Sequence, residues 1–234
     1  MHCFWCANPE GISRHSALSL NSNDDDTLDG IYHQDIENSY QTLNLDDVIE
    51  EAIECRPLFF DGGGVTLTGG EPTVQFEPVL ELLKRLKGKE INTAIETNAS
   101  LVELPKLFPY IDYLMMDIKH WDDIAHMHYT GLGTGTVIQN LDEAFNFGRN
   151  VAIRIPLING VNSEDCDISG YLDLLKKYNP ERYTIEFLPY HEYGKNKWVQ
   201  RGMDYKIKDG KVTKNKLERF HSMFTAAGIR IIET

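Results

Sequence analysis

The alternation of strand-like and helix-like segments is the feature of this sequence that most constrains its fold. Short apolar segments of strand character occupy 65–68, 92–97, 113–118, 151–157, 183–188 and 229–232. Segments with apolar residues at helical spacing lie at 45–53, after the N-cap candidate Asn44, and at 75–88, 101–111, 137–147, 167–178 and 214–227. Strands and helices in this order form a parallel sheet with crossover helices. The expected fold is α/β, either an open doubly wound sheet or a full or partial (β/α) barrel.

The length and charge of the chain limit its organisation and its partners. A chain of 234 residues is long enough for one large domain with its own core, so we expect a single domain over 1–234. The net charge of −13 argues against a broad nucleic-acid footprint or an anionic membrane surface. No apolar run reaches the roughly 18 residues of a membrane span. Residues 9–44 are polar and are interpreted as a surface excursion.

The four cysteines divide into one close pair and two isolated residues. Cys3 and Cys6 form a C-x-x-C, whereas Cys55 and Cys166 fall in helical patterns and are interpreted as small buried hydrophobic residues without a function. A disulfide framework is not expected in an α/β chain of this size, which favours a reducing, cytoplasmic setting. A zinc or thioredoxin-like pair is a weaker interpretation, because no second cysteine pair follows at zinc spacing.

Polar and ionisable residues recur where the expected strands end. They are Gly69, Gly70 and Glu71 after the first strand, Glu96, Thr97 and Asn98 at the second, Asp117 and Lys119 at the third, Arg154 in the fourth and His191 after the fifth. Each of these residues alone could be a cap or a surface charge. Because the carboxyl ends of parallel strands gather at one edge of a sheet or barrel, together they indicate a polar ligand at that edge.

Several of these segments together resemble one family. The segments are Cys3–Glu10, Gly69–Pro72, Glu96–Asn98, Met115–Lys119 and Leu188–Trp198. They resemble the radical SAM activating enzymes of glycyl radical enzymes, the group that includes pyruvate formate-lyase activating enzyme. The Gly-Gly-Glu segment is shared by many radical SAM enzymes, whereas the stretch from Pro189 to Trp198 is specific to the activating enzymes. The resemblance extends from Cys3 to about residue 230.

The resemblance implies a fold and a chemistry. The fold would be a partial (β/α)6 radical SAM barrel with parallel strands. The cofactors would be a [4Fe–4S] cluster held by three cysteines and S-adenosylmethionine, whose reductive cleavage gives a 5′-deoxyadenosyl radical. That radical would abstract a hydrogen atom from a glycine of a partner glycyl radical enzyme. A flavodoxin or ferredoxin would supply the electron, and the activating enzyme would be a monomer in an anaerobic cytoplasm.

The resemblance also assigns roles to individual residues. Cys3 and Cys6 would be cluster ligands, with no further cluster in this chain. The positions that contact S-adenosylmethionine would be Trp5, Gly69, Gly70, Glu71, Glu96, Thr97, Asn98, Lys119, Arg154 and His191. A monovalent cation would lie at Glu96, Thr97, Met115 and Asp117, although Glu96 stands where the family pattern has aspartate.

One part of the family pattern has no counterpart in this sequence. The family motif is C-x-x-x-C-x-x-C, and its first cysteine would lie four residues before Cys3, which is two residues before Met1 and outside this sequence. An opening β-strand would precede it. We therefore expect an N-terminally truncated chain that lacks the first strand, leaves an edge strand exposed and binds a [4Fe–4S] cluster poorly.

Two other interpretations of the whole chain stay open at this stage. A cluster-deficient, non-catalytic remnant that binds S-adenosylmethionine or a protein would explain the missing cysteine. Another small radical SAM enzyme, similar to 7-carboxy-7-deazaguanine synthase, would share the strand-end residues. The stretch from Tyr190 to Trp198 counts against the second of these interpretations.

Overall fold

Six parallel strands form a single sheet in this computed structural model, which describes residues 1–12 and 41–233. The strands are β1 (Gly64–Leu67), β2 (Asn92–Thr97), β3 (Tyr113–Asp117), β4 (Val151–Leu157), β5 (Tyr183–Pro189) and β6 (Arg230–Ile231). Each strand pairs with its sequence neighbours, in the order β1-β2-β3-β4-β5-β6. The sheet does not close on itself, so the parallel α/β fold predicted from the alternation is confirmed as an open sheet.

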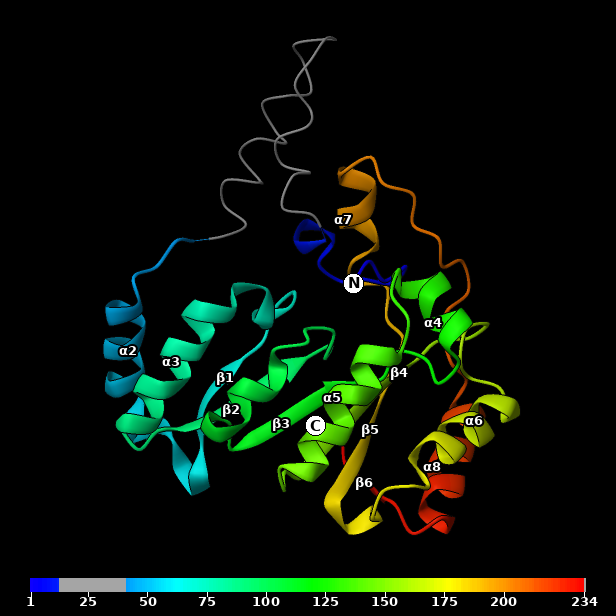
Figure 1. Ribbon diagram of the computed structural model, residues 1–234. Helices are drawn as coiled ribbons and strands as arrows, with labels where there is room; N and C mark the ends of the chain where they lie inside the picture. The colour runs from blue at the N-terminus through cyan, green and yellow to red at the C-terminus, as the bar shows by residue number, and fades with distance from the viewer. Residues whose placement is uncertain (13–40, 234) are drawn as a thin grey trace, which may run out of the picture.

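Helices connect the strands and cover the sheet (Figure 1). The α-helices are α2 (Leu45–Glu54), α3 (Phe76–Gly88), α4 (Asp123–Thr130), α5 (Gly135–Asn146), α6 (Asp165–Leu175), α7 (Lys195–Gln200) and α8 (Lys214–Ala226). Short 3-10 turns occupy η1 (Pro9–Gly11), η2 (Arg56–Leu58), η3 (Phe60–Gly62), η4 (Pro72–Gln75), η5 (Leu104–Tyr110) and η6 (Pro180–Arg182). No helix in the described ranges combines the length and hydrophobicity that a membrane span requires.

The main core lies between the sheet and its helices. Every residue of β4 except Arg154 is buried, as expected for a strand that is covered on both faces. Fully buried Ile153 and Ile185 on adjacent strands pack in one cluster with Phe220 and Phe224 of α8. Burial of each such side chain contributes about 1.5–3 kcal/mol. This continuous core fixes the strand ends, and therefore the positions of the polar residues that follow them.

The structure corrects some details of the sequence-based expectations. The segment 101–111 forms the 3-10 turn η5 rather than an α-helix, since Pro105 and Pro109 lack the N–H donors that an α-helix requires. Cys166 is exposed on α6, and Cys55 is half-buried at the end of α2, so the expectation of two buried cysteines was wrong. Most of the expected polar excursion at 9–44 lies outside the described residues.

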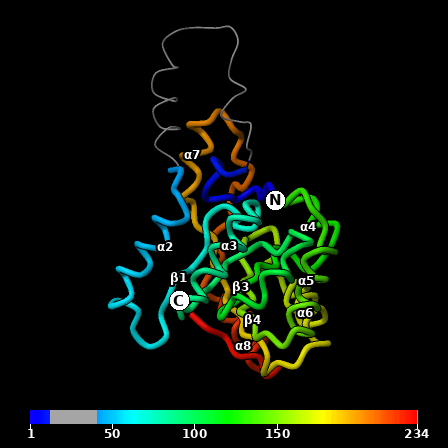
Figure 2. Tube along the Cα trace, turned by 60° about the vertical axis from the view of Figure 1, so that its left-hand side comes forward, coloured from blue at the N-terminus to red at the C-terminus, as the bar shows by residue number. Residues whose placement is uncertain are grey.

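The N-terminal segment, residues 1–12, lies over the end of the sheet at which the strands terminate. In both ribbon and tube views it passes beneath α7 and next to α4 (Figures 1 and 2). No strand precedes Cys3 in the described part of the chain, and β1 is an edge strand that pairs only with β2. The C-x-x-C therefore lies in a loop above the strand ends, where the candidate polar residues are also found.

Candidate functional site

The cysteine loop, residues 2–8, is attached first to the last turn of α4. The backbone N–H of His2 donates to the carbonyl of Thr130 at 2.6 Å, and that of Phe4 donates to the carbonyl of Tyr129 at 3.1 Å. The final carbonyls of a helix have no partner within the helix. The cysteine loop satisfies two of them, so α4, a helix that the sequence pattern did not reveal, holds the start of the loop in place.

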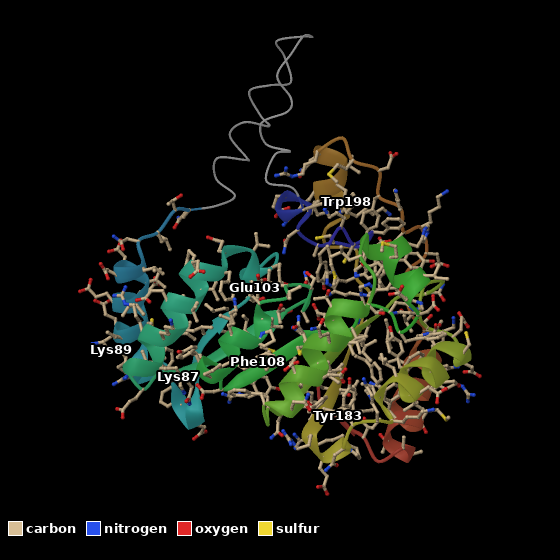
Figure 3. The ribbon with its side chains drawn as sticks, viewed as in Figure 1. Lys87, Lys89, Glu103, Phe108, Tyr183 and Trp198 are labelled. Carbon is tan, nitrogen blue, oxygen red and sulfur yellow. The ribbon has the colours of Figure 1, made fainter. Side chains whose placement is uncertain are left out.

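A second attachment comes from α7 and the residue before it. Trp198 is 6% exposed and donates its indole N–H to the carbonyl of Cys6 at 2.8 Å; Figure 3 shows its position on α7. Gly194 packs against the same segment so closely that a Cβ there would lie 2.7 Å from the Cys6 carbonyl oxygen. We call Gly194, Lys197 and Trp198 the α7 clamp.

Lys197 extends the α7 clamp beyond the cysteines. Its ammonium donates to Asn8 Oδ1 at 2.9 Å and to Glu10 Oε1 at 2.8 Å. Burial favours the neutral form of Glu10, but the hydrogen bond from Lys197 holds the pKa of that carboxyl below its ordinary value. These residues belong to the stretch that carries the most specific resemblance, and the structure gives that stretch a physical role: it packs on the cysteine loop.

The two thiols share a tight turn above the end of β3. The Cys6 N–H donates to the Cys3 carbonyl at 3.1 Å. Burial raises the pKa of both thiols, while the ammonium of Lys119 opposes that rise at each of them. Burial acts to lower the pKa of Lys119 itself, yet Asp117 and Cys3 raise it above its ordinary value. Lys119 at the end of β3 therefore interacts electrostatically with both thiols.

Glu71 joins the ends of β1 and β2. Its Oε1 accepts from the Thr73 N–H at 3.1 Å and from the hydroxyls of Thr73 at 2.6 Å and Thr97 at 2.7 Å. Its Oε2 accepts from the Asn98 N–H at 2.7 Å. This carboxylate therefore holds two strand ends together, and Oε2 keeps one lone pair for another donor.

The glycines before Glu71 allow the chain to turn beneath the N-terminal segment. Gly69 has a φ of +128°, a backbone conformation that residues with a side chain rarely adopt. A Cβ on Gly70 would lie 3.9 Å from the Cα of Gly11, so the turn that follows β1 lies under η1. The backbone conformation thus explains Gly69, whereas Gly70 has room for a side chain beside Gly11.

Charged residues from the next strands lie beside this network. Arg154 on β4 pairs with Glu96 of β2 at 2.5 Å and with Glu186 of β5 at 2.8 Å. Lys119 pairs with Asp117 Oδ2 at 2.7 Å. Glu186 was not among the predicted site residues, although a glutamate inside a largely apolar strand is a signal in the sequence.

One carboxylate oxygen at the end of β3 has no hydrogen-bond partner within the described residues. Asp117 Oδ1 is buried, and the structure gives it no hydrogen bond there. A buried carboxylate oxygen without a partner is unfavourable. This oxygen is free to accept a hydrogen bond from a ligand group at the end of β3.

The remaining expected site residues are less tightly held. Trp5 lies in the cysteine loop with its ring centroid 6.2 Å from that of Tyr129, and Met115 is half-buried on β3. His191 is exposed and stacks on Tyr193 at 4.2 Å. The structure therefore brings the residues from β1 to β4 together, whereas His191 lies at the outer end of β5.

The donor set does not complete the three-thiolate cluster site that the resemblance implies. Cys3 and Cys6 supply two thiols, and the other cysteines belong to α2 and α6. No group of three His, Cys, Asp or Glu side chains in residues 1–12 and 41–233 is arranged to hold a metal ion. A full cluster site needs a third thiolate beyond those that these residues bring together.

The chain is similar to several activating enzymes. The chain is 29% identical, over 98% of its length and 86% of the relative's, to the 4-hydroxyphenylacetate decarboxylase activating enzyme of Clostridioides difficile strain 630. It is 37% identical to the choline trimethylamine-lyase activating enzyme of Oleidesulfovibrio alaskensis, over 70% of this chain and 54% of that protein.

A solved structure and a family model complete the comparison. A domain of pyruvate-formate lyase-activating enzyme from Bacteroides vulgatus superposes with a TM-score of 0.60 at 24% identity, covering 73% of this chain and 98% of that domain, which supports the fold. The model of the radical SAM superfamily, whose cofactors are a [4Fe–4S] cluster and S-adenosylmethionine, matches residues 1–170. This chain belongs to the radical SAM superfamily.

Proposed function

We propose that this chain is an activating enzyme of a glycyl radical enzyme. The reaction is the one-electron reductive cleavage of S-adenosylmethionine to methionine and a 5′-deoxyadenosyl radical. That radical then takes a hydrogen atom from a glycine Cα of the partner, giving 5′-deoxyadenosine and a glycyl radical. The cofactor supplies the radical chemistry, and the protein binds, orients and shields it.

The attachment of the α7 clamp to the cysteine loop is the observation that carries this proposal. The clamp comes from the stretch that resembles activating enzymes specifically, and Trp198 and Gly194 contact the backbone of Cys6 directly. The relatives at 29% and 37% identity are both activating enzymes, of a decarboxylase and of a lyase respectively. The stretch that resembles activating enzymes specifically therefore supports the backbone of the cysteine loop.

The geometry supports a pose for S-adenosylmethionine at the ends of β1 to β4. We assign its amino group to Glu71 Oε2 and to the backbone after β1, because Oε2 accepts only one hydrogen bond from the protein. Its carboxylate would lie toward Lys119. Asp117 Oδ1, which is buried and has no hydrogen-bond partner within the described residues, would accept from a ligand N–H or O–H. Trp5 offers an aromatic face for the adenine.

Two of the expected ligand contacts would have to compete with ion pairs already present. Arg154 lies between Glu96 and Glu186, and Glu96 also accepts from Thr68 at 3.0 Å. The guanidinium would bind a carboxylate only by giving up one of these partners. We therefore place Arg154 as the group that neutralises Glu96, and we keep the cation position at Glu96, Thr97, Met115 and Asp117 as a proposal to be tested by potassium titration.

The missing thiolate favours one second candidate. A remnant that binds S-adenosylmethionine or a protein without cleaving it needs only the strand-end residues, and those are assembled. It differs from the activating enzyme in one respect that can be measured: supplying a cysteine four residues before Cys3 would not give it the ability to cleave S-adenosylmethionine.

The proposed function also implies a reductant and a location. A one-electron carrier of the flavodoxin or ferredoxin type would supply the electron, and the protein would work as a monomer in an anaerobic cytoplasm. The reducing compartment is proposed because a disulfide framework is not expected in an α/β chain of this size.

The experiment that tests the proposal is anaerobic reconstitution with iron and sulfide of two proteins: the chain itself and a version extended to carry Cys-Pro-x in front of His2. We expect the extended protein to convert S-adenosylmethionine to 5′-deoxyadenosine with dithionite, and the unextended chain to do so poorly. A fully reconstituted extended protein that forms no 5′-deoxyadenosine would refute the activating-enzyme assignment and leave the remnant.

A further inference from the structure

The positive charge of this acidic protein is concentrated in one segment. Between Lys195 and Arg219 there are nine Lys or Arg residues and three Asp or Glu residues, a net charge of +6. Because the whole chain has a net charge of −13, the other residues together carry −19. Such segregation creates a local potential that differs in sign from that of the rest of the surface.

Part of this charge is neutralised within the protein and part is free. Lys197, Lys216 and Arg219 pair with Glu10, Glu164 and Asp165 of other elements. By contrast, Lys208 and Lys211 are exposed and form no ion pair with any described residue. Lys206 is exposed as well, and its ammonium lies 4.4 Å from the ring centroid of Phe4. We call Lys206, Lys208 and Lys211 the lysine edge.

The backbone of the lysine edge is fixed by packing. Ile207, between the first two lysines, is 8% exposed. The carbonyl of Gly210 accepts from the Asn159 N–H at 2.9 Å, and that of Asp209 accepts from the Asn159 side-chain amide at 3.0 Å. A Cβ at Gly210 would lie 2.6 Å from Ile207. The ammonium groups therefore project from a rigid loop, which reduces the ordering entropy that a partner would have to overcome.

The lysine edge lies next to the cysteine loop. A groove of about 420 Å³ is lined by Phe4 of that loop, by His128 and Tyr129 of α4, and by Lys206 and Lys208. Phe4 is the residue directly after Cys3. The same groove also includes the carboxylate-bearing residue Asp209. A partner that docks here is brought to the outer side of the segment that carries both thiols.

We propose that the lysine edge and this groove are the docking surface for an acidic one-electron carrier protein, an inference that rests on the proposed function. Electron-transfer complexes are small and weak, and complementary charge steers their association. A compact acidic protein can meet a local basic surface. A nucleic acid or an anionic bilayer would extend beyond it onto a surface that is strongly negative.

Binding of a flavodoxin, an acidic one-electron carrier, to the intact chain without added cofactors provides the test. The double variant Lys208→Glu/Lys211→Glu reverses two free charges outside the cysteine loop. The control Lys84→Glu/Lys89→Glu changes the net charge equally, on α3 and at its C-cap; Figure 3 shows Lys89 far from Trp198. At low salt we expect the first variant to weaken binding about tenfold or more, and the control to change it little.

Three results would overturn the proposal. The first is equal weakening by both variants, which would indicate a general effect of net charge. The second is unchanged flavodoxin binding in 0.5 M salt, where a charge-steered complex should weaken. The third is that the Lys208→Glu/Lys211→Glu variant keeps its affinity for flavodoxin and loses affinity for phosphatidylglycerol vesicles, duplex DNA or a glycyl radical enzyme. Since binding is measured without S-adenosylmethionine cleavage, failure of the proposed function would appear separately, as no 5′-deoxyadenosine with dithionite.

Discussion

Replacement of Gly194 by alanine tests whether the α7 clamp holds the cysteine loop. Gly194 has φ −80° and ψ −16°, a conformation that alanine adopts without strain. A Cβ there would nevertheless lie 2.6 Å from Ala7 Cα, 2.7 Å from the Cys6 carbonyl oxygen and 2.9 Å from the Ala7 carbonyl oxygen. All three are backbone atoms, so no side-chain rotation can relieve the contact.

The magnitude follows from two opposing effects. Gly-to-Ala replacement at a compatible backbone position stabilises a protein by about 0.4–1 kcal/mol through the unfolded state. Overpacking costs about 1–3 kcal/mol. If the cysteine loop relieves the clash by detaching, that cost corresponds to about 5- to 150-fold more frequent opening of the loop. Detachment would also break the hydrogen bond from Trp198 to Cys6.

Two measurements report the effect. Urea unfolding gives the global free energy, and iodoacetamide modification of Cys3 and Cys6, followed by mass spectrometry, reports opening of the loop. The matched control is Gly135→Ala at the first residue of α5, where an added Cβ meets no atom within 4 Å. The control should be neutral or stabilising. Modification of Cys6 at the wild-type rate in Gly194→Ala, with unchanged stability, would refute the reasoning.

Three further predictions concern the thiols and the strand ends. Because partial burial raises the pKa of Cys3 and Cys6, and the thiolate is the reactive form, their alkylation should rise with pH through a midpoint above about 8.5. A midpoint near 7 would contradict the raised pKa of the two thiols. Glu71→Gln should lower the free energy of unfolding by about 1–3 kcal/mol in urea titrations, since one of two accepting oxygens is lost, whereas no change would mean that Glu71 does not join β1 to β2. Iron analysis after reconstitution should give well under four irons per chain, and near four when a cysteine stands four residues before Cys3.

The sequence predicted the sheet well because its signals are local. Each strand is a short apolar run, and the order of strands and helices forces parallel pairing, so all six strands were found close to their expected bounds. The helix after Asn44 was also predictable, since that side chain accepts from the Asp46 N–H at 3.0 Å as an N-cap. The prolines at 105 and 109 could have warned against a helix there.

The site was only partly predictable, because its contacts join distant segments. The sequence placed Glu71, Thr97 and Asp117 at strand ends, but it could not show that Glu71 uses both oxygens within the protein. Nor could it show that Trp198 donates to Cys6, a residue 192 positions away in sequence. Helix α4, short and with buried His126 and Thr130, carries a weak apolar pattern and was missed.

Product analysis and electron paramagnetic resonance on one sample test whether this chain activates a glycyl radical enzyme. The sample contains the extended protein with a full cluster, S-adenosylmethionine, dithionite and a glycyl radical enzyme from a neighbouring gene. We expect 5′-deoxyadenosine together with a glycyl radical on the partner, and neither product when Cys6 is replaced by serine. A full cluster that yields no 5′-deoxyadenosine, or yields it without ever forming a glycyl radical on any such partner, would show that this chain is not an activating enzyme.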